Sequence, residues 1–246
     1  MNATYISEAI EALQTSILMH VRHRTLQHYL GEPTLRAPQL FFIRLPFLLN
    51  MQQINEIDAV TVGIVHASLE EHDQIKEIEA TTKEQQLRVL SGDYYSGRYY
   101  QLLAQTGNIL LIQKLSQAIV TRCEHQITVY EFNERSIAEW IDSLKVIQTE
   151  LITQYYVANG LENFVPLMQE TLTIVRLQEE LSCIKDGAAS RFGKSLVANS
   201  SVHEDITAVL QKEITKRQQA LQQLLENAEL DDALAQYVTN LGGCQK

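Results

Sequence analysis

The sequence has few residues that break helices or cross-link chains: 246 residues include only 10 glycines, 4 prolines and 3 cysteines. Cys123, Cys183 and Cys244 show neither CxxC spacing nor a histidine at ligand spacing, which argues against a disulfide framework or a structural zinc site. With 45% hydrophobic residues, the scarcity of breakers favours an all-helical protein. No linker or repeat interrupts the chain, so we expect one domain over residues 1–246.

Basic residues are also scarce, with 20 Lys and Arg against 30 Asp and Glu and a net charge of -10. A protein that binds nucleic acid through its phosphates needs a basic surface, so we expect no nucleic-acid partner. The most apolar stretch, residues 40–49, is too short to span a bilayer and contains Arg44 and Pro46, so it is interpreted as a core helix. The first residues lack a signal-peptide pattern. We therefore expect a cytoplasmic protein without stable membrane insertion.

The spacing of apolar residues near 3.6 predicts a succession of helices. Thr81 or Thr82 and Ser136 are candidate N-caps, and Gly107 and Gly160 are candidate stops. The predicted helices span residues 5–30, a segment beginning at 37 or 38, and residues 55–78, 82–105, 109–124, 136–158, 166–184, 202–225 and 230–241. Their number indicates a bundle of about ten helices.

Four segments occur in an informative order: residues 31–38 (GEPTLRAP), 66–77 (HASLEEHDQIKE), 90–97 (LSGDYYSG) and 176–185 (RLQEELSCIK). In this order they resemble the trans-isoprenyl diphosphate synthases, and more narrowly component I of two-component heptaprenyl diphosphate synthases. The Leu-x-Gly-Asp-Tyr run around Gly92 carries most of the resemblance. The resemblance implies an all-α isoprenyl diphosphate synthase-like bundle.

The same resemblance shows which family residues this chain lacks. Residues 31–38 stand where the family has a basic run that binds the diphosphate of isopentenyl diphosphate; Arg36 and a nearby proline are kept, but the lysine and first arginine of that run are absent. Asp73 matches the first aspartate of the DDxxD motif, but Gln74 and Glu77 replace the other two. In the second aspartate motif the three positions are occupied by non-ligands, namely Leu181, Ser182 and Lys185.

The missing aspartates matter because ionising an allylic diphosphate requires Mg²⁺ ions held by several carboxylates. We therefore expect no catalytic residue, metal ligand or cofactor in this chain, with Mg²⁺ bound by a catalytic partner. Glu70, Asp73 and Glu77 form a degenerate diphosphate motif on one helical stripe. They could hold one weak Mg²⁺, although an acidic, solvated helix face is the preferred interpretation.

An aromatic cluster follows the Gly92 run. Its residues are candidates for a partner interface, because aromatic residues and arginine are enriched there; they are Tyr94, Tyr95, Arg98, Tyr99 and Tyr100. Ordinary core packing is the alternative. Gly92 and Gly97 each cost a helix about 1 kcal/mol relative to alanine, which close approach of another helix would offset.

The resemblance implies an auxiliary subunit that supports catalytic component II. That partner would extend farnesyl diphosphate with isopentenyl diphosphate in the trans configuration for the menaquinone side chain. The complex would hold the prenyl diphosphate, and the chain alone could form a homodimer. Two alternatives stay open: an independent degenerate prenyltransferase or terpene-cyclase-like enzyme, and a helical scaffold or binding protein without prenyl chemistry.

Overall fold

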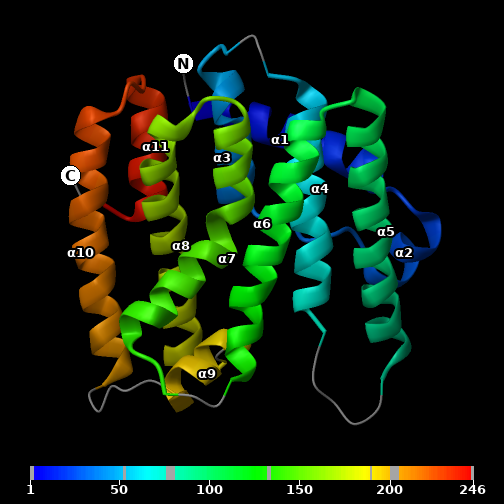
Figure 1. Ribbon diagram of the computed structural model, residues 1–246. Helices are drawn as coiled ribbons and strands as arrows, with labels where there is room; N and C mark the ends of the chain where they lie inside the picture. Colours follow the sequence, from blue (N-terminus) through cyan, green and yellow to red (C-terminus); the bar gives the residue numbers. More distant parts are fainter. Residues whose placement is uncertain are drawn as a thin grey trace. The chain divides into compact units, whose positions relative to one another are not determined.

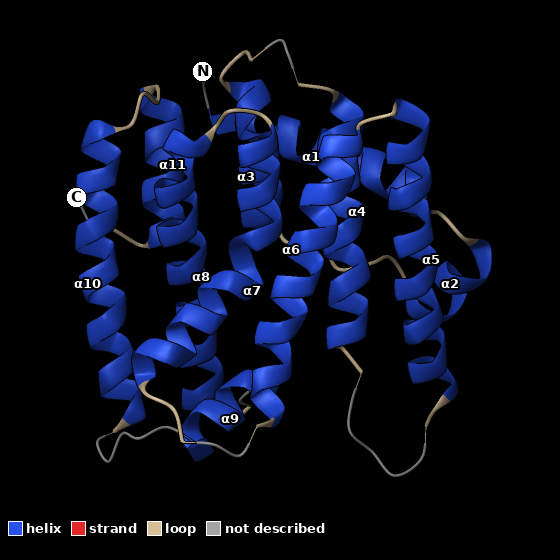
Figure 2. Cartoon of the chain, in the orientation of Figure 1, coloured by secondary structure: helices blue, strands red, loops and turns tan. Residues whose placement is uncertain are grey.

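The computed structural model describes residues 3–51, 54–75, 81–131, 134–188, 190–199 and 205–244. Every regular element in these ranges is a helix (Figure 2). The α-helices are α1 (Ala3–Val21), α2 (Arg24–Leu30), α3 (Ala37–Leu48), α4 (Glu56–Asp73), α5 (Lys83–Thr106), α6 (Ile109–Ile127), α7 (Ile137–Ala158), α8 (Val165–Lys185), α9 (Arg191–Asn199), α10 (Ile206–Asn227) and α11 (Asp232–Gly242). Two 3₁₀ helices are η1 (Thr128–Tyr130) and η2 (Glu162–Phe164). The all-α prediction is confirmed.

Local capping chemistry explains several helix ends. Thr82 accepts a hydrogen bond from the backbone N–H of Gln85 and begins α5. Ser136 and Glu139 form a reciprocal capping box at the start of α7. α5 ends at Gly107, whose φ of 70° is left-handed and suits glycine. These ends lie where the sequence predicts them.

Three predictions of helix extent were wrong. The helix expected over residues 5–30 is divided, because extended His23 caps α2 by accepting a hydrogen bond from the N–H of Leu26. α4 ends at Asp73 and not near residue 78. The sequence pattern also missed α9, a nine-residue helix that begins after Ser190. Residues 76–80 and 200–204 lie outside the described part of the chain.

The chain divides into two compact units, and the first is Asn2–Leu115. Within it α4 packs along α5, while α1 packs against α3 and α4, and α2 against α5 (Figure 1). The core of this unit includes Ile17, Phe41 and Ile64, all fully buried. α3 is buried over most of its surface, which confirms that the apolar window is a core helix.

The second unit is Ser116–Lys246. α8 is its central helix, because it packs against α7, α10 and α11. Trp140, Tyr155 and Tyr156 on α7 are fully buried in its core. The expectation of one domain over residues 1–246 stays a prediction. In the described part of the chain, no helix combines the length and apolar character needed to cross a bilayer.

Candidate functional site

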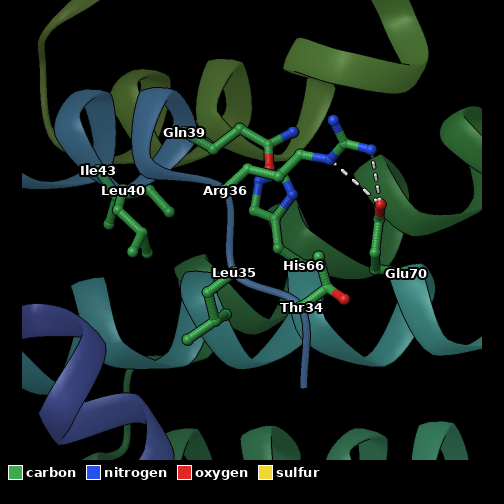
Figure 3. Close-up of a pocket in the computed structure, with 8 residues that line it drawn as sticks. All are labelled: Thr34, Leu35, Arg36, Gln39, Leu40, Ile43, His66 and Glu70. Carbon is green, nitrogen blue, oxygen red and sulfur yellow. Dashed lines mark hydrogen bonds and ion pairs between the residues drawn. The ribbon is translucent and has the colours of Figure 1, made fainter. Parts of the chain in front are cut away.

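The first acidic motif is joined to the basic segment by an ion pair. Arg36 immediately precedes α3, and its Nε and Nη2 atoms both donate to Oε1 of Glu70 on α4, at 3.1 and 3.0 Å (Figure 3). The Arg36 and Glu70 side chains are 28% and 22% exposed. Arg36 and Glu70 lie 34 residues apart in the sequence, so tertiary folding creates the pair. The cation therefore neutralises one carboxylate of the degenerate motif.

A small pocket adjoins this ion pair. It is lined by Thr34, Leu35, Arg36, Gln39, Leu40, Ile43, His66 and Glu70 (Figure 3). The volume open to the centre of a water molecule is about 10 Å³, which is room for about one water. Gln74 donates to the Thr34 hydroxyl at 3.2 Å and holds the loop before α3 against the end of α4. The pocket in this form is too small for a diphosphate group.

Of the other two members of the predicted motif, Asp73 lies in the described part of the chain. Asp73 is the last residue of α4 and is half-buried. Glu77 lies outside the described residues. Across the described ranges, no group of three or more His, Cys, Asp or Glu side chains is arranged to hold a metal ion. The absence of a metal or cofactor in this chain stays a prediction.

Glu71 is a buried member of the same segment that the motif comparison missed. Its side chain is 4% exposed, and Oε2 accepts hydrogen bonds from Arg88 and Ser91 on α5, both at 3.1 Å. Burial raises the pKa of neighbouring Tyr95 to about 12, and the charge of Glu71 adds to this shift. The two adjacent glutamates thus have different partners. Glu70 binds Arg36 in the loop before α3, and Glu71 binds Arg88 and Ser91 of α5.

α4 and α5 also approach each other closely at Gly92. The Ser68 hydroxyl donates to the Gly92 carbonyl at 2.7 Å. A Cβ atom at Gly92 would lie 2.4 Å from Nε2 of His72. Gly97 has no atom within 4 Å of its Cβ position. The close approach predicted at these two glycines therefore occurs at Gly92, between two helices of this chain. At Gly97, no neighbour in the described part of the chain is close enough to need a glycine.

The aromatic cluster on α5 divides between the interior and the surface. Tyr94 stacks edge-on against His23, with ring centres 5.4 Å apart, and Arg98 donates to the His20 carbonyl at 3.0 Å. Tyr95 is 3% exposed. Tyr94 and Arg98 therefore bind α5 to the junction of α1 and α2, and Tyr95 belongs to the core. Tyr99 is half-buried, with its pKa raised by burial. Tyr100 is 57% exposed.

The segment compared with the second aspartate motif contains another buried acid. Glu180 on α8 is 1% exposed and forms an ion pair with Arg176, one turn earlier on the same helix. Ser190 donates to both Glu180 oxygens, at 2.7 and 2.6 Å. The Ser190 hydroxyl also accepts from the N–H of Gly193 at the start of α9. The Arg176–Glu180 spacing is visible in the sequence, but the burial of Glu180 is not.

The three positions aligned with the second motif, residues 181, 182 and 185, are not acidic. Leu181 is 5% exposed and belongs to the core. Ser182 and Lys185 are exposed. The arginine partners of Glu180 and Glu70 come from this chain itself, which leaves both acids engaged in ion pairs.

The arrangement of helices matches that of isoprenyl diphosphate synthases. A geranylgeranyl pyrophosphate synthase from Lactobacillus brevis ATCC 367 has a TM-score of 0.64, with 97% of this chain and 95% of that chain covered at 11% identity. A decaprenyl diphosphate synthase from Rhodobacter capsulatus also has a TM-score of 0.64, with 98% and 96% covered at 14% identity. At these identities the likeness establishes the fold class, which confirms the predicted isoprenyl diphosphate synthase-like bundle.

Residues 23–226 match the family of heptaprenyl diphosphate synthase (HEPPP synthase) subunit 1. The chain therefore belongs to this family. A heptaprenyl diphosphate synthase component 1 from Geobacillus stearothermophilus is 28% identical over 95 residues, which are 39% of this chain and 43% of that protein. The matched stretch thus spans less than half of that relative's length. The resemblance drawn from the four sequence segments is confirmed.

Proposed function

We propose that this chain is the auxiliary, non-catalytic subunit of a two-component polyprenyl diphosphate synthase. The observation that carries the proposal is that Glu70, Glu71 and Glu180, in or beside the segments compared with the aspartate motifs, are each paired with an arginine of this chain. Membership in the subunit 1 family supports the same division of work.

The physical reason lies in the charge that departs with diphosphate. Mg²⁺ ions stabilise that charge when carboxylates hold them with open coordination positions. A carboxylate that already accepts a bidentate or multiple hydrogen bond from arginine must break that pair before it can bind a cation. The second segment also presents Leu181 and Lys185 where acids would be needed. The chain alone is therefore proposed not to elongate prenyl chains.

In the proposed complex, component II supplies the aspartate motifs and the Mg²⁺. It extends farnesyl diphosphate by adding isopentenyl diphosphate units in the trans configuration, and the product serves as the menaquinone side chain. The present subunit completes the active heterodimer in the cytoplasm. It also contributes to the complex that holds the growing prenyl diphosphate. A homodimer of this chain is the proposed state when the partner is absent.

The outer face of α5 is the proposed contact for component II. Tyr100 and Leu90 are both 57% exposed, and Val89 is 38% exposed. Gly97 lies on the same exposed side of the helix and leaves space for a close neighbour. Within the aromatic cluster, Tyr100 is thus the candidate direct contact. Tyr94, Tyr95 and Arg98 support the helix from behind, and Tyr99 lies between the two groups.

The interface can be tested by the affinity of purified variants for component II. Replacing Tyr100 with alanine should weaken binding by about tenfold or more, as expected for an aromatic residue at an interface hot spot. Tyr130→Ala is a matched control, because Tyr130 on η1 is 45% exposed. Equal affinities of the Tyr100→Ala variant and the native chain would remove this face from the proposed interface.

The function is tested by expressing the chain with and without the catalytic component encoded in the same organism. Each preparation receives farnesyl diphosphate, labelled isopentenyl diphosphate and Mg²⁺, and the labelled long-chain products are measured. We expect products from the mixture only. Products from this chain alone would support the alternative of an independent enzyme. A mixture no more active than component II alone would contradict the auxiliary role.

A further inference from the structure

The junction of α1 and α2 is a basic stretch in an acidic chain. Residues 12–31 contain no Asp or Glu, although the whole chain has 30 of them against 20 Lys and Arg. Arg22 and Arg24 lie in this stretch, and both are exposed. Five arginines elsewhere in the described chain pair with carboxylates, namely Arg36, Arg44, Arg88, Arg176 and Arg217. Arg22 and Arg24 form no hydrogen bond or ion pair with a described residue, so their charges are available to an external partner.

Helix α2 presents an aromatic ring on the same side as its charge. Residues four apart share a side of a helix, so Arg24 and His28 lie together. Thr25 and Tyr29 form the neighbouring pair on that side. All four side chains are exposed, and Tyr29 is 49% exposed, whereas Leu26 is buried. The outer side of α2 is therefore cationic and aromatic, and its inner side is apolar.

Helix α5 adds a further cation to this surface. α2 packs against α5 (Figure 1), and Nζ of exposed Lys83 lies 3.9 Å from the centre of the Tyr29 ring. Just before α2, the His23 ring contacts Tyr94 of α5. Contacts at both ends thus hold α2 along α5. The α2 basic face is defined by five exposed residues: Arg22, Arg24, His28, Tyr29 and Lys83.

We propose that the α2 basic face binds the surface of a membrane that contains anionic lipid headgroups, reversibly and without inserting a helix. An Arg or Lys near such a surface tightens binding by about fivefold. Tyrosine suits the level of the headgroups, because its ring is apolar and its hydroxyl group remains in water. Met19, three residues before Arg22, is 72% exposed and adds an apolar side chain to the same junction.

The composition of the face favours a lipid surface over a protein partner. The core of a protein interface is depleted in charged residues, lysine in particular, and needs a closely packed apolar centre. The α2 basic face has three cations and one aromatic ring on a helix about 10 Å long. Lipid headgroups are mobile and can bind such a face without a complementary shape.

The net charge of -10 is compatible with this binding. At physiological ionic strength, charges separated by more than about 8–10 Å are largely screened. The membrane therefore interacts mainly with the charges that face it. Repulsion from acidic parts of the chain opposes other modes of approach, which favours contact through the basic face.

This inference goes beyond the proposed auxiliary function and does not rest on it. The proposed contact for component II is the side of α5 that carries Tyr100, whereas the lipid contact is the outer side of α2. The elongation assay contains no vesicles. Failure of membrane binding would therefore leave its result unchanged, and failure of the auxiliary role would leave membrane binding unchanged.

The experiment measures co-sedimentation of the full chain with two kinds of vesicle, at low and at high sodium chloride concentration. One kind is phosphatidylcholine alone, and the other is phosphatidylcholine mixed with phosphatidylglycerol. The test variant combines Arg22→Gln with Arg24→Gln, and a charge-preserving variant combines Arg22→Lys with Arg24→Lys. The matched control combines Lys212→Gln with Lys216→Gln, which removes two exposed cations from α10.

We expect the native chain to bind the mixed vesicles only, and binding should weaken as the salt concentration rises. The glutamine variant of Arg22 and Arg24 should bind about tenfold or more weakly, because two charges are lost. The lysine variant and the α10 control should bind like the native chain. If the glutamine variant does not unfold cooperatively, the salt dependence of the native chain and the binding of the lysine variant decide the outcome.

Four results would overturn the proposal. They are no binding to the mixed vesicles, equal binding to both kinds of vesicle, binding that does not respond to salt, and an equal loss in the α10 control. The glutamine variant is also titrated with component II. A loss of that affinity, together with no vesicle binding by the native chain, would assign the α2 basic face to a protein interface.

Discussion

Glu70 on α4 and Glu180 on α8 both meet an arginine, but the two ion pairs are built differently. Arg36 reaches Glu70 from 34 residues away, and the pair lies near the surface with Glu70 22% exposed. Arg176 reaches Glu180 from one helical turn away, and Glu180 is 1% exposed. The α4 pair thus fastens a loop to a helix, whereas the α8 pair, with Ser190, anchors the start of α9.

Acids that occupy similar positions in the two motif segments therefore contribute unequally to the stability of the fold. An exposed pair is replaced by water at little cost, whereas removing one member of a buried pair leaves an uncompensated charge. We therefore expect stability to depend strongly on Glu180 and on Glu71, and weakly on Glu70. Variants at these and two further positions test this difference, and the largest effect is expected where the acid is most buried.

The largest effect is expected for Glu180→Ala. It leaves the Arg176 guanidinium and the Ser190 hydroxyl without their buried acceptor, and it should lower the free energy of unfolding by about 3–5 kcal/mol. Denaturant unfolding of the full chain measures this change. Glu179→Ala is the matched control, because Glu179 pairs with the same arginine but is 40% exposed. Equal losses in both variants would refute the claim that burial sets the importance of the pair.

Glu71→Gln should lower the free energy of unfolding by about 2 kcal/mol, because Arg88 then loses a buried charged acceptor between α4 and α5. Glu70→Gln, one residue earlier on the same helix, should lower it by less than about 1 kcal/mol. Denaturant unfolding again provides the measurement. If Glu70→Gln is the more harmful of the two, the exposed pair is the stronger anchor and the comparison above is wrong.

Gly92→Ala tests the close contact between α4 and α5. The added methyl group would lie 2.4 Å from the His72 ring, so the ring must move, and we expect a loss of about 2 kcal/mol. Gly97→Ala on the same helix meets no atom within 4 Å and should gain up to about 1 kcal/mol from helix propensity. Melting curves of the two variants should shift in opposite directions. A Gly92→Ala protein as stable as the native chain would contradict the close packing.

The smallest effect concerns His20 at the end of α1, which α5 reaches through Arg98. Burial and then the Arg98 charge hold the pKa of His20 below its ordinary value. The unfolded chain therefore takes up this proton first, so the contribution of His20 to stability is present above the ordinary pKa and declines as pH falls through the lowered value. In a nuclear magnetic resonance titration, Arg98→Met should raise the His20 pKa. An unchanged titration curve would exclude the influence of Arg98.

Much of the fold was accessible from the sequence because its signals are local. The N-caps Thr82 and Ser136 follow from side chains that bond backbone groups three residues away. The stop at Gly107 follows from the left-handed conformation that glycine tolerates. The family resemblance was also correct, since it depends on the order of motifs along the chain.

The candidate site was only partly predictable. The sequence placed Glu70 in the degenerate motif and Arg36 in the earlier basic segment, but it did not show that the two side chains pair. Glu71 was missed because its burial depends on contact with α5. Tyr94 and Arg98 were assigned to a partner surface, whereas both also bind the junction of α1 and α2 in this chain. The break at His23 was missed because the apolar spacing continues across it, while the capping bond interrupts the helix.

The order of residues alone determined the helical class, most helix ends, the family and the loss of two aspartate motifs, because periodicity, capping and motif identity are properties of neighbouring residues. Only the tertiary structure decided which acid is buried, which arginine neutralises it and which side of α5 is exposed. The reason is physical: charge pairing and desolvation depend on distance in space, and residues 34 positions apart become neighbours only when the chain has folded.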